Sequence, residues 1–145
     1  MKSLVAPFRD EHEALAGLAS ELREAVNGPE PADPVALFHL RRNFSQKLTA
    51  HLHGEDWVLY PRLRASSDPR VAAIADRFSR EMAPLTTRYL AYARTWTSAA
   101  MGADWLGFRA ATIAILDALA ERMAREDREL YACADGDYEG ARKAA

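Results

Sequence analysis

The sequence predicts an all-α protein, an up-down-up-down antiparallel bundle of four helices. Apolar residues recur at intervals of three and four in four separate stretches, and nowhere do they alternate as in a half-buried strand. Short connections rich in proline, glycine and aspartate separate the stretches, so consecutive helices should be antiparallel neighbours. A chain of 145 residues fits one domain. We expect the bundle over residues 1–134 and a polar C-terminal tail over 135–145, with no internal repeat.

The first two helices are bounded by turn and capping residues. The first is expected over about residues 8–26, ending at Asn27-Gly28-Pro29. The second is expected over about residues 34–60, because Asp33-Pro34 combines a capping side chain with a proline suited to the first turn. It should end before Pro61, since proline disfavours helical geometry in the residue that precedes it.

The third and fourth helices have similar signals. Ser67-Asp68-Pro69 opens the third, which should end near Gly102, and Asp104 opens the fourth, which should reach about Ala134. Pro84 lies inside the third helix, where it removes a backbone hydrogen bond. We expect a kink there, or a break between two shorter helices.

Composition excludes several classes of function. Apolar residues form 49% of the chain and the formal charge is −2, so neither a disordered protein nor a strongly basic nucleic-acid or membrane binder is expected. The first residues lack the apolar run of a signal peptide, and no apolar stretch is long enough to cross a bilayer. The single cysteine, Cys133, rules out an internal disulfide and favours a cytoplasmic location. Without a nucleophile-base-acid order, a phosphate loop or a Cys-x-x-Cys pair, we expect no enzyme and no catalytic residues.

Five ionisable residues fall inside the apolar stripes, where burial of a charge is costly unless it is compensated. They are His12, His51, Glu55, Arg122 and Glu126. Counted at 1.5 Å per residue, all five reach one level of the bundle. Two imidazoles and two carboxylates at one level are typical of non-haem iron sites in helical bundles. The alternative is mutual neutralisation, with Arg122 pairing with both carboxylates.

At these residues the sequence resembles the hemerythrin-like, or HHE cation-binding, family of four-helix bundles, over about residues 5–133. The resemblance rests on Asp10-Glu-His12-Glu-Ala-Leu15, His51-Leu-His-Gly-Glu55-Asp-Trp-Val-Leu-Tyr-Pro61 and Arg122-Met-Ala-Arg-Glu126-Asp-Arg-Glu-Leu-Tyr131. It implies a two-iron site with histidines from all four helices and two bridging carboxylates. Such proteins carry or sense oxygen, sense redox state, or handle iron and nitric oxide.

The sequence departs from the family pattern in its third and fourth helices. Met82 stands where the third helix should offer a histidine, and Arg122 stands where the fourth should offer one. Carried over from the family, His12, His51, Glu55 and Glu126 would furnish one complete ligand set. Arg122 offers only donors, so we expect its charge to replace the second cation through a bidentate contact with the carboxylates. We expect Met82 to fill space and, with Phe8 and Phe78, to line a pocket at the site.

Two functions therefore remain open at the level of sequence. One is a metal-binding or sensing protein with one ion, iron or alternatively zinc or manganese, that binds a small diatomic ligand such as dioxygen or nitric oxide. The other is a metal-free regulatory or interaction protein in which the charge of Arg122 replaces the metal. We expect no two-iron centre, and the sequence specifies no protein partner.

Overall fold

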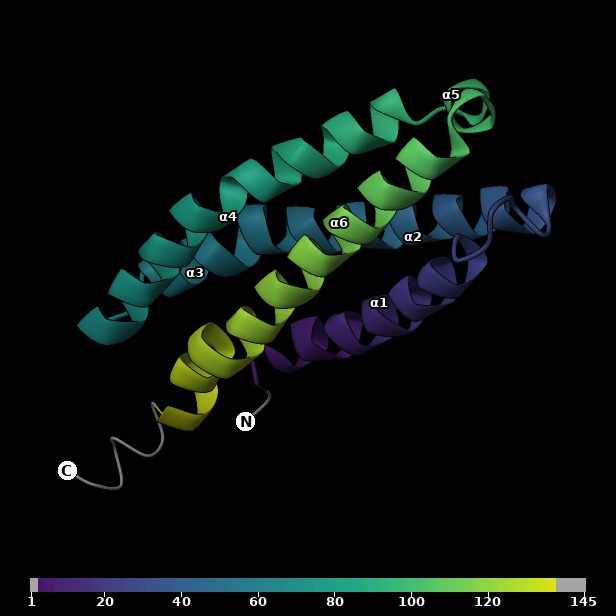
Figure 1. Cartoon of the computed structure of the whole chain (residues 1–145). Helices are drawn as coiled ribbons and strands as arrows, with labels where there is room; N and C mark the ends of the chain where they lie inside the picture. The colour runs from purple at the N-terminus through teal and green to yellow at the C-terminus, as the bar shows by residue number, and fades with distance from the viewer. Residues whose placement is uncertain (1–2, 138–145) are drawn as a thin grey trace.

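The computed structural model describes residues 3–137, which form helices and no strand (Figure 1). The predicted all-α class is therefore confirmed. The elements in chain order are α1 Ala6–Ala25, α2 Pro34–Gly54, η1 Glu55–Leu59, α3 Tyr60–Arg64, α4 Pro69–Thr95, α5 Ser98–Ala103, α6 Trp105–Arg125, η2 Glu126–Tyr131 and η3 Cys133–Asp137. The three η elements are π-helical turns.

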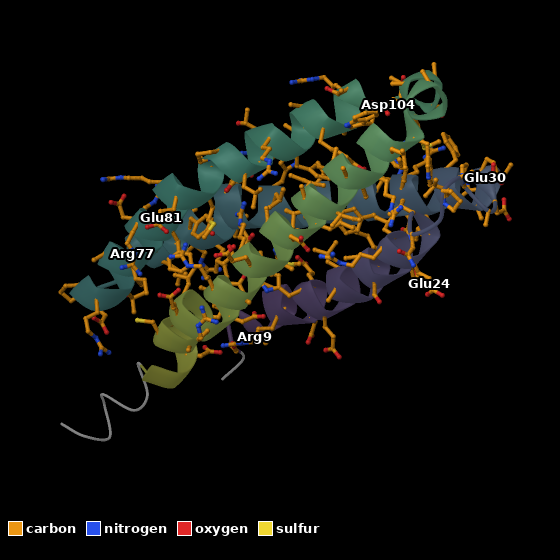
Figure 2. All side chains as sticks on the ribbon, in the orientation of Figure 1. Arg9, Glu24, Glu30, Arg77, Glu81 and Asp104 are labelled. Atoms are coloured by element: carbon orange, nitrogen blue, oxygen red, sulfur yellow. The ribbon has the colours of Figure 1, made fainter. Side chains whose placement is uncertain are left out.

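Four long helices lie alongside one another. Helix α1 packs against α2 and α6, and α4 packs against α6 and α3 (Figure 1). Charged side chains such as Glu24, Glu30 and Arg77 are exposed on the outside (Figure 2). No helix in residues 3–137 combines the length and the apolar character that crossing a bilayer would require.

The aspartates predicted to cap the helices do so. The side chains of Asp33, Asp68 and Asp104 accept hydrogen bonds from the backbone N–H groups of Ala36, Arg70 and Gly107, at 3.0, 2.9 and 2.9 Å. Each bond satisfies one of the N–H groups that the first turn of a helix leaves unpaired. The starts of α2, α4 and α6 are therefore set by local sequence.

Some predicted helix ends are wrong. The second helical run does not end before Pro61, because η1 changes the hydrogen-bond register and places Pro61 in the first turn of α3, where a missing N–H costs little. Helix α4 ends at Thr95, and Thr97 then caps the separate helix α5. The last helical run does not stop near Ala134 but continues to Asp137.

Of the two alternatives expected at Pro84, the break is wrong, because α4 continues through this residue, and the kink stays a prediction. Pro84 and Arg80, whose carbonyl loses its partner, both lie on the exposed face of the helix. Water can bind that carbonyl, so the helix tolerates the proline.

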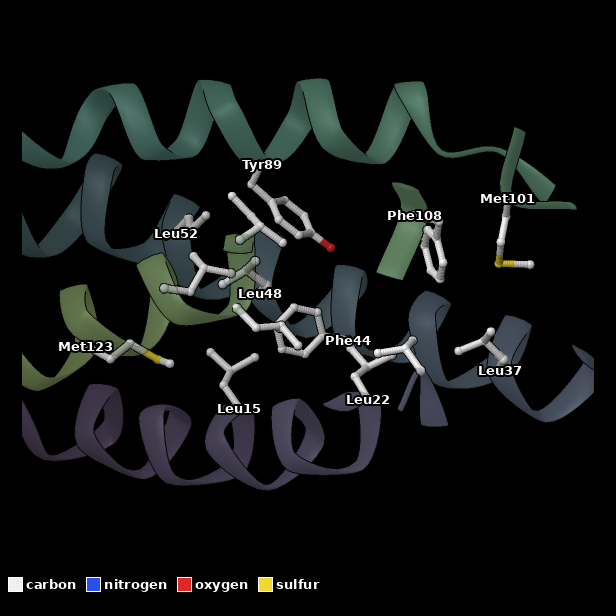
Figure 3. Close-up of a cluster of buried hydrophobic side chains, with 14 residues drawn as sticks. Leu15, Leu22, Leu37, Phe44, Leu48, Leu52, Tyr89, Met101, Phe108 and Met123 are labelled. Atoms are coloured by element: carbon white, nitrogen blue, oxygen red, sulfur yellow. The ribbon is translucent and has the colours of Figure 1, made fainter. Parts of the chain in front are cut away.

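The core is divided into two apolar clusters along the bundle. One contains Leu15, Leu48 and Met123 (Figure 3), and the other contains Leu59, Phe78 and Leu130. The ionisable residues of the predicted layer lie between members of the two clusters. This holds on α1, on α2 with η1, and on α6 with η2. A polar layer is thus enclosed by apolar packing on both sides.

Candidate metal centre

Five ionisable side chains are buried together between the two clusters. The exposed fractions are 4% for His12, 2% for His51, 3% for Arg122 and 0% for both Glu55 and Glu126. One ligand atom from each histidine and each glutamate lies within 4.8 Å of all the others. The structure therefore brings together the four candidate ligands and the arginine that the sequence singled out.

The two imidazoles face each other across the layer. Their Nε2 atoms are 3.0 Å apart. The Nδ1 atom of His12 is 2.9 Å from Oδ1 of Asp127, and Nδ1 of His51 is 2.7 Å from Oε1 of Glu11. Carboxylates in these positions favour a proton on Nδ1, so Nε2 of each ring is the atom that could bind a metal once it is deprotonated.

One oxygen from each carboxylate completes the group. Oε1 of Glu55 lies 3.0 Å from Nε2 of His51, and Oε1 of Glu126 lies 3.3 Å from Nε2 of His12. Despite this approach, Oε1 of Glu126 is buried and has no hydrogen-bond partner within the described residues. An unsatisfied buried oxygen is costly, and a cation among two nitrogens and two oxygens would satisfy it. The donor set fits a divalent transition metal.

The other oxygen of each carboxylate binds a tyrosine. Tyr60 donates to Oε2 of Glu126 at 2.5 Å, and Tyr131 donates to Oε2 of Glu55 at 2.6 Å. Burial and the two carboxylate charges raise the pKa of both hydroxyls, so they remain protonated donors. Tyr131 also stacks on His12, with ring centroids 5.2 Å apart. The tyrosines thus leave the Oε1 atoms directed toward the imidazoles.

Arg122 contacts both buried carboxylates. Its Nη2 lies 3.3 Å from Oε1 of Glu55 and its Nε lies 3.4 Å from Oε2 of Glu126. Its Nη1 donates to the backbone oxygen of Met82 at 3.3 Å. Burial alone would lower the pKa of Arg122, but the two carboxylates outweigh it and raise that pKa, so the residue stays charged. The guanidinium thus contacts both carboxylates, each through a different nitrogen.

Neighbouring charges determine the protonation of the remaining groups. Burial would lower the pKa of His51, but Glu55 and Glu11 outweigh it and raise the pKa to about 9. Burial and the charge of Glu126 raise the pKa of Glu55. Burial also tends to raise the pKa of Glu126, but His12 and Arg122 outweigh it and lower that pKa. Without a metal, a proton on His51 therefore balances part of the carboxylate charge.

Sequence reasoning missed the two tyrosines, because Tyr60 directly follows the π-helical turn η1 and Tyr131 is the last residue of η2. In an α-helix the fifth residue after a glutamate lies about 140° around the axis from it. In η1 and η2, bonding from residue i to i+5 widens the turn and brings Tyr60 and Tyr131 back toward the bundle interior. The same widening leaves Val58, three residues after Glu55, 48% exposed although α-helical spacing would turn it toward the interior.

An internal correspondence could have revealed the tyrosines, and the prediction of no repeat was wrong. The pattern Glu-Asp-x-x-Leu-Tyr occurs at residues 55–60 and again at 126–131. His51 and Arg122 each precede the glutamate by four residues. The reciprocal Tyr60–Glu126 and Tyr131–Glu55 bonds show that this sequence repeat is also a spatial one.

The two halves differ at the positions that correspond to the histidines. Glu11-His12 of α1 corresponds to Glu81-Met82 of α4, each three residues after a phenylalanine, Phe8 or Phe78. Asp56, the counterpart of the aspartate that binds His12, is half-buried, and burial raises its pKa. The second half therefore has carboxylates at the outer positions, and a thioether and a guanidinium at the positions that correspond to His12 and His51.

The residues expected to line a pocket are packed in the core. Phe78 is 0% and Met82 is 5% exposed, both inside the second apolar cluster. Phe8 packs against that cluster and edge-on against His51, with ring centroids 5.9 Å apart. A cavity of about 570 Å³ instead reaches the site between α1 and α6, where it borders His12 and Asp127. Its walls include four alanines, Ala16, Ala19, Ala120 and Ala124.

The remaining histidines and the cysteine lie outside the site. His39 and His53 are exposed, as their positions on α2 predict, and His53 stacks on Trp57 with ring centroids 4.3 Å apart. Cys133 is buried at 7% exposure in the second cluster. None of these residues belongs to the group of converging ligand atoms.

Comparison with known protein families agrees with this geometry. The profile of the Hemerythrin HHE cation binding domain family matches residues 3–134. Neither the comparison with curated proteins nor that with solved structures gave a match. The matched range covers nearly the whole chain and includes the four converging histidines and glutamates, and so the chain belongs to the hemerythrin HHE cation-binding domain family.

Proposed function

We propose that this protein binds one divalent transition-metal ion, iron(II) in the first place, through His12, His51, Glu55 and Glu126. The observation that carries the proposal is the convergence of four possible ligand atoms, one of them a buried oxygen without a hydrogen bond in the described residues. Two histidines with carboxylates and an open position are typical of non-haem iron(II), and zinc or manganese also suits these donors.

A single ion is favoured because Met82 and Arg122, in the other half of the layer, are not suitable metal ligands. Met82 offers a soft thioether, which is a weak ligand for iron(II). Arg122 offers only N–H donors, and its charge lies 3.3 Å from Glu55, where it would oppose a second cation. We therefore propose a mononuclear site and no two-iron centre.

We further propose that the protein senses a diatomic molecule, dioxygen or nitric oxide, and is not an enzyme. The cavity between α1 and α6 borders His12, and small alanine side chains in its walls leave room for a ligand to approach the site. A bound iron(II) would supply an open coordination position to such a ligand. His12 and His51 would hold the ion while Tyr60 and Tyr131 keep the carboxylates oriented.

Anaerobic iron(II) loading followed by nitric oxide tests this function. We expect a saturable change in visible absorption that needs iron and disappears in His51→Ala. His53→Ala, which changes an exposed histidine two residues away, should leave the change intact. An identical response in both variants, or none in the iron-loaded parent, would end the proposal.

A metal-free regulatory or interaction protein is the second candidate, and the Arg122 bridge supports it. With His51 protonated, two cations face two carboxylates, so the layer can be neutral without metal. This candidate expects a chelator to leave the melting temperature unchanged, whereas a protein purified with its metal should melt at a lower temperature after chelation.

The remaining features extend the proposal to the whole chain. We propose an up-down-up-down arrangement of α1, α2, α4 and α6, with the bundle over residues 1–134. The polar tail proposed over 135–145 lies mostly outside the described residues. A cytoplasmic location is proposed from the single buried cysteine, Cys133.

A further inference from the structure

A second cavity, of about 380 Å³, lies between α2, α4 and α6, toward the opposite end of the bundle from the metal ligands. Its walls are rich in aromatic side chains, namely Phe38, Phe44, Tyr89, Tyr92 and Trp96. Phe44 and Tyr89 approach each other inside the bundle, with ring centroids 6.2 Å apart (Figure 3). A concave, mostly apolar space of this size is typical of a small-molecule site.

Arg41 places a positive charge in the wall of this cavity. The residue is half-buried, and its Nη2 donates to the backbone oxygen of Trp96 at 2.7 Å. Its guanidinium lies over the ring of Phe108, 4.8 Å from the centroid. No Asp or Glu of residues 3–137 forms an ion pair with it at 4.0 Å or less. A partly desolvated cation without a counter-ion favours an anionic ligand.

Two hydroxyl pairs add hydrogen-bond donors to the same space. Ser45 and Tyr89 are 2.5 Å apart, and Tyr92 and Thr112 are 2.6 Å apart. Two hydroxyls that bind each other use one O–H between them, so each pair retains a second O–H for a ligand. Burial raises the pKa of both tyrosines, which keeps them protonated and able to donate.

We propose that this cavity binds a small aromatic carboxylate. The carboxylate would pair with Arg41 and accept from the hydroxyl pairs, while the ring packs against Phe44 and Trp96. An aromatic body matches walls on which rings stack, and the cation disfavours basic ligands. The site shares no residue with the metal ligands, so its occupancy is independent of the proposed metal function.

Calorimetric titration with 3-phenylpropionate tests the proposal, with 3-phenylpropan-1-ol as the uncharged comparison. We expect saturable binding of the acid, and binding of the alcohol weaker by about tenfold or more, because a charge-assisted hydrogen bond is lost. Fluorescence of Trp96 should change on binding, and Trp96→Phe should remove that change. Chelator treatment should leave the affinity for the acid unchanged.

Variants separate recognition of the charge from the shape of the cavity. Arg41→Met should abolish the preference for the acid over the alcohol, and Arg94→Gln, on the exposed face of α4, should not. Ala93→Phe fills the cavity without removing a polar group and should block both ligands, whereas Ala73→Phe at an exposed site should not. Circular dichroism and melting establish that each variant folds. Equal affinity of the folded parent for acid and alcohol, unchanged acid binding by folded Ala93→Phe, or no saturation in the millimolar range would overturn the proposal.

Discussion

Arg122 lies with Nη2 3.3 Å from Oε1 of Glu55, and both side chains are almost completely buried. The arginine comes from α6 and the glutamate from the first position of η1, so their contact joins two distant parts of the chain. A guanidinium enclosed in this way compensates two carboxylates that water cannot reach. Its removal should therefore destabilise the fold far more than the loss of a surface cation.

We predict that Arg122→Ala lowers the free energy of unfolding by about 3–5 kcal/mol, because it leaves two buried carboxylates uncompensated. Arg125→Ala is the matched control on the same helix, since Arg125 pairs with Glu81 and Glu129 near the surface. Its loss should be about 0–1 kcal/mol. Urea denaturation of the metal-free proteins measures both, and equal losses would contradict the buried bridge.

Asp127 binds the Nδ1 atom of His12 and so orients the imidazole. It should therefore raise metal affinity without binding the metal itself. Asp127→Asn weakens that acceptor, and we expect metal affinity to fall by about 10- to 100-fold. Asp117 lies on the same helical run as Asp127 and forms an exposed ion pair with Arg23 of α1. Asp117→Asn removes a charge there and should leave metal affinity unchanged. Competition with a chelating dye gives both affinities. The orienting role would be refuted by the same affinity in both variants.

The two tyrosines should matter to similar extents, because each donates to the buried glutamate of the other half. We expect Tyr60→Phe and Tyr131→Phe each to cost about 1–3 kcal/mol of stability, since a buried carboxylate oxygen loses its donor. Tyr89→Phe removes a hydroxyl bound to the neutral Ser45 and should cost about 0.5–1.5 kcal/mol. Thermal denaturation compares the three, and a larger loss for Tyr89→Phe would count against the reciprocal arrangement.

Restoring imidazoles in the second half should create a second metal position. The contact of Arg122 with the backbone of Met82 shows that positions 82 and 122 are adjacent in space. Asp56 remains where its counterpart Asp127 holds His12. We predict that Met82→His combined with Arg122→His raises metal content from one ion to two per chain. Iron content equal to that of the parent, in a folded double variant, would show that these positions do not form a site.

The sequence predicted the ionisable layer because its members lie in regular α-helix or at the first residue of a π-helical turn. Steps of 100° placed His51 and Glu55 on one face, and Arg122 and Glu126 on another, as the structure shows them. Counting along the helices also brought His12 to the same level. Regular geometry was sufficient for these five residues.

For the residues after Glu55 and Glu126, regular α-helical geometry did not predict which side chains face the interior. The π-helical turns changed the direction in which Val58, Tyr60 and Tyr131 face, and hydrophobic periodicity does not report such a change. Glu11 and Asp127 lie beside a stripe and not within it, so periodicity did not single them out either. Pro84 was expected to break a helix, but the sequence did not show that its freed carbonyl would face water. Each failure concerns local geometry or exposure that depends on tertiary packing.

Metal content per chain is the measurement that tests the central claim most directly. Protein purified without chelator, and protein stripped and reloaded anaerobically with iron(II), should each contain one transition-metal ion per chain by elemental analysis. The double variant His12→Ala with His51→Ala should retain none, while His39→Ala with His53→Ala should match the parent. Absence of metal from the reloaded parent, or equal content in the two double variants, would contradict the proposed centre.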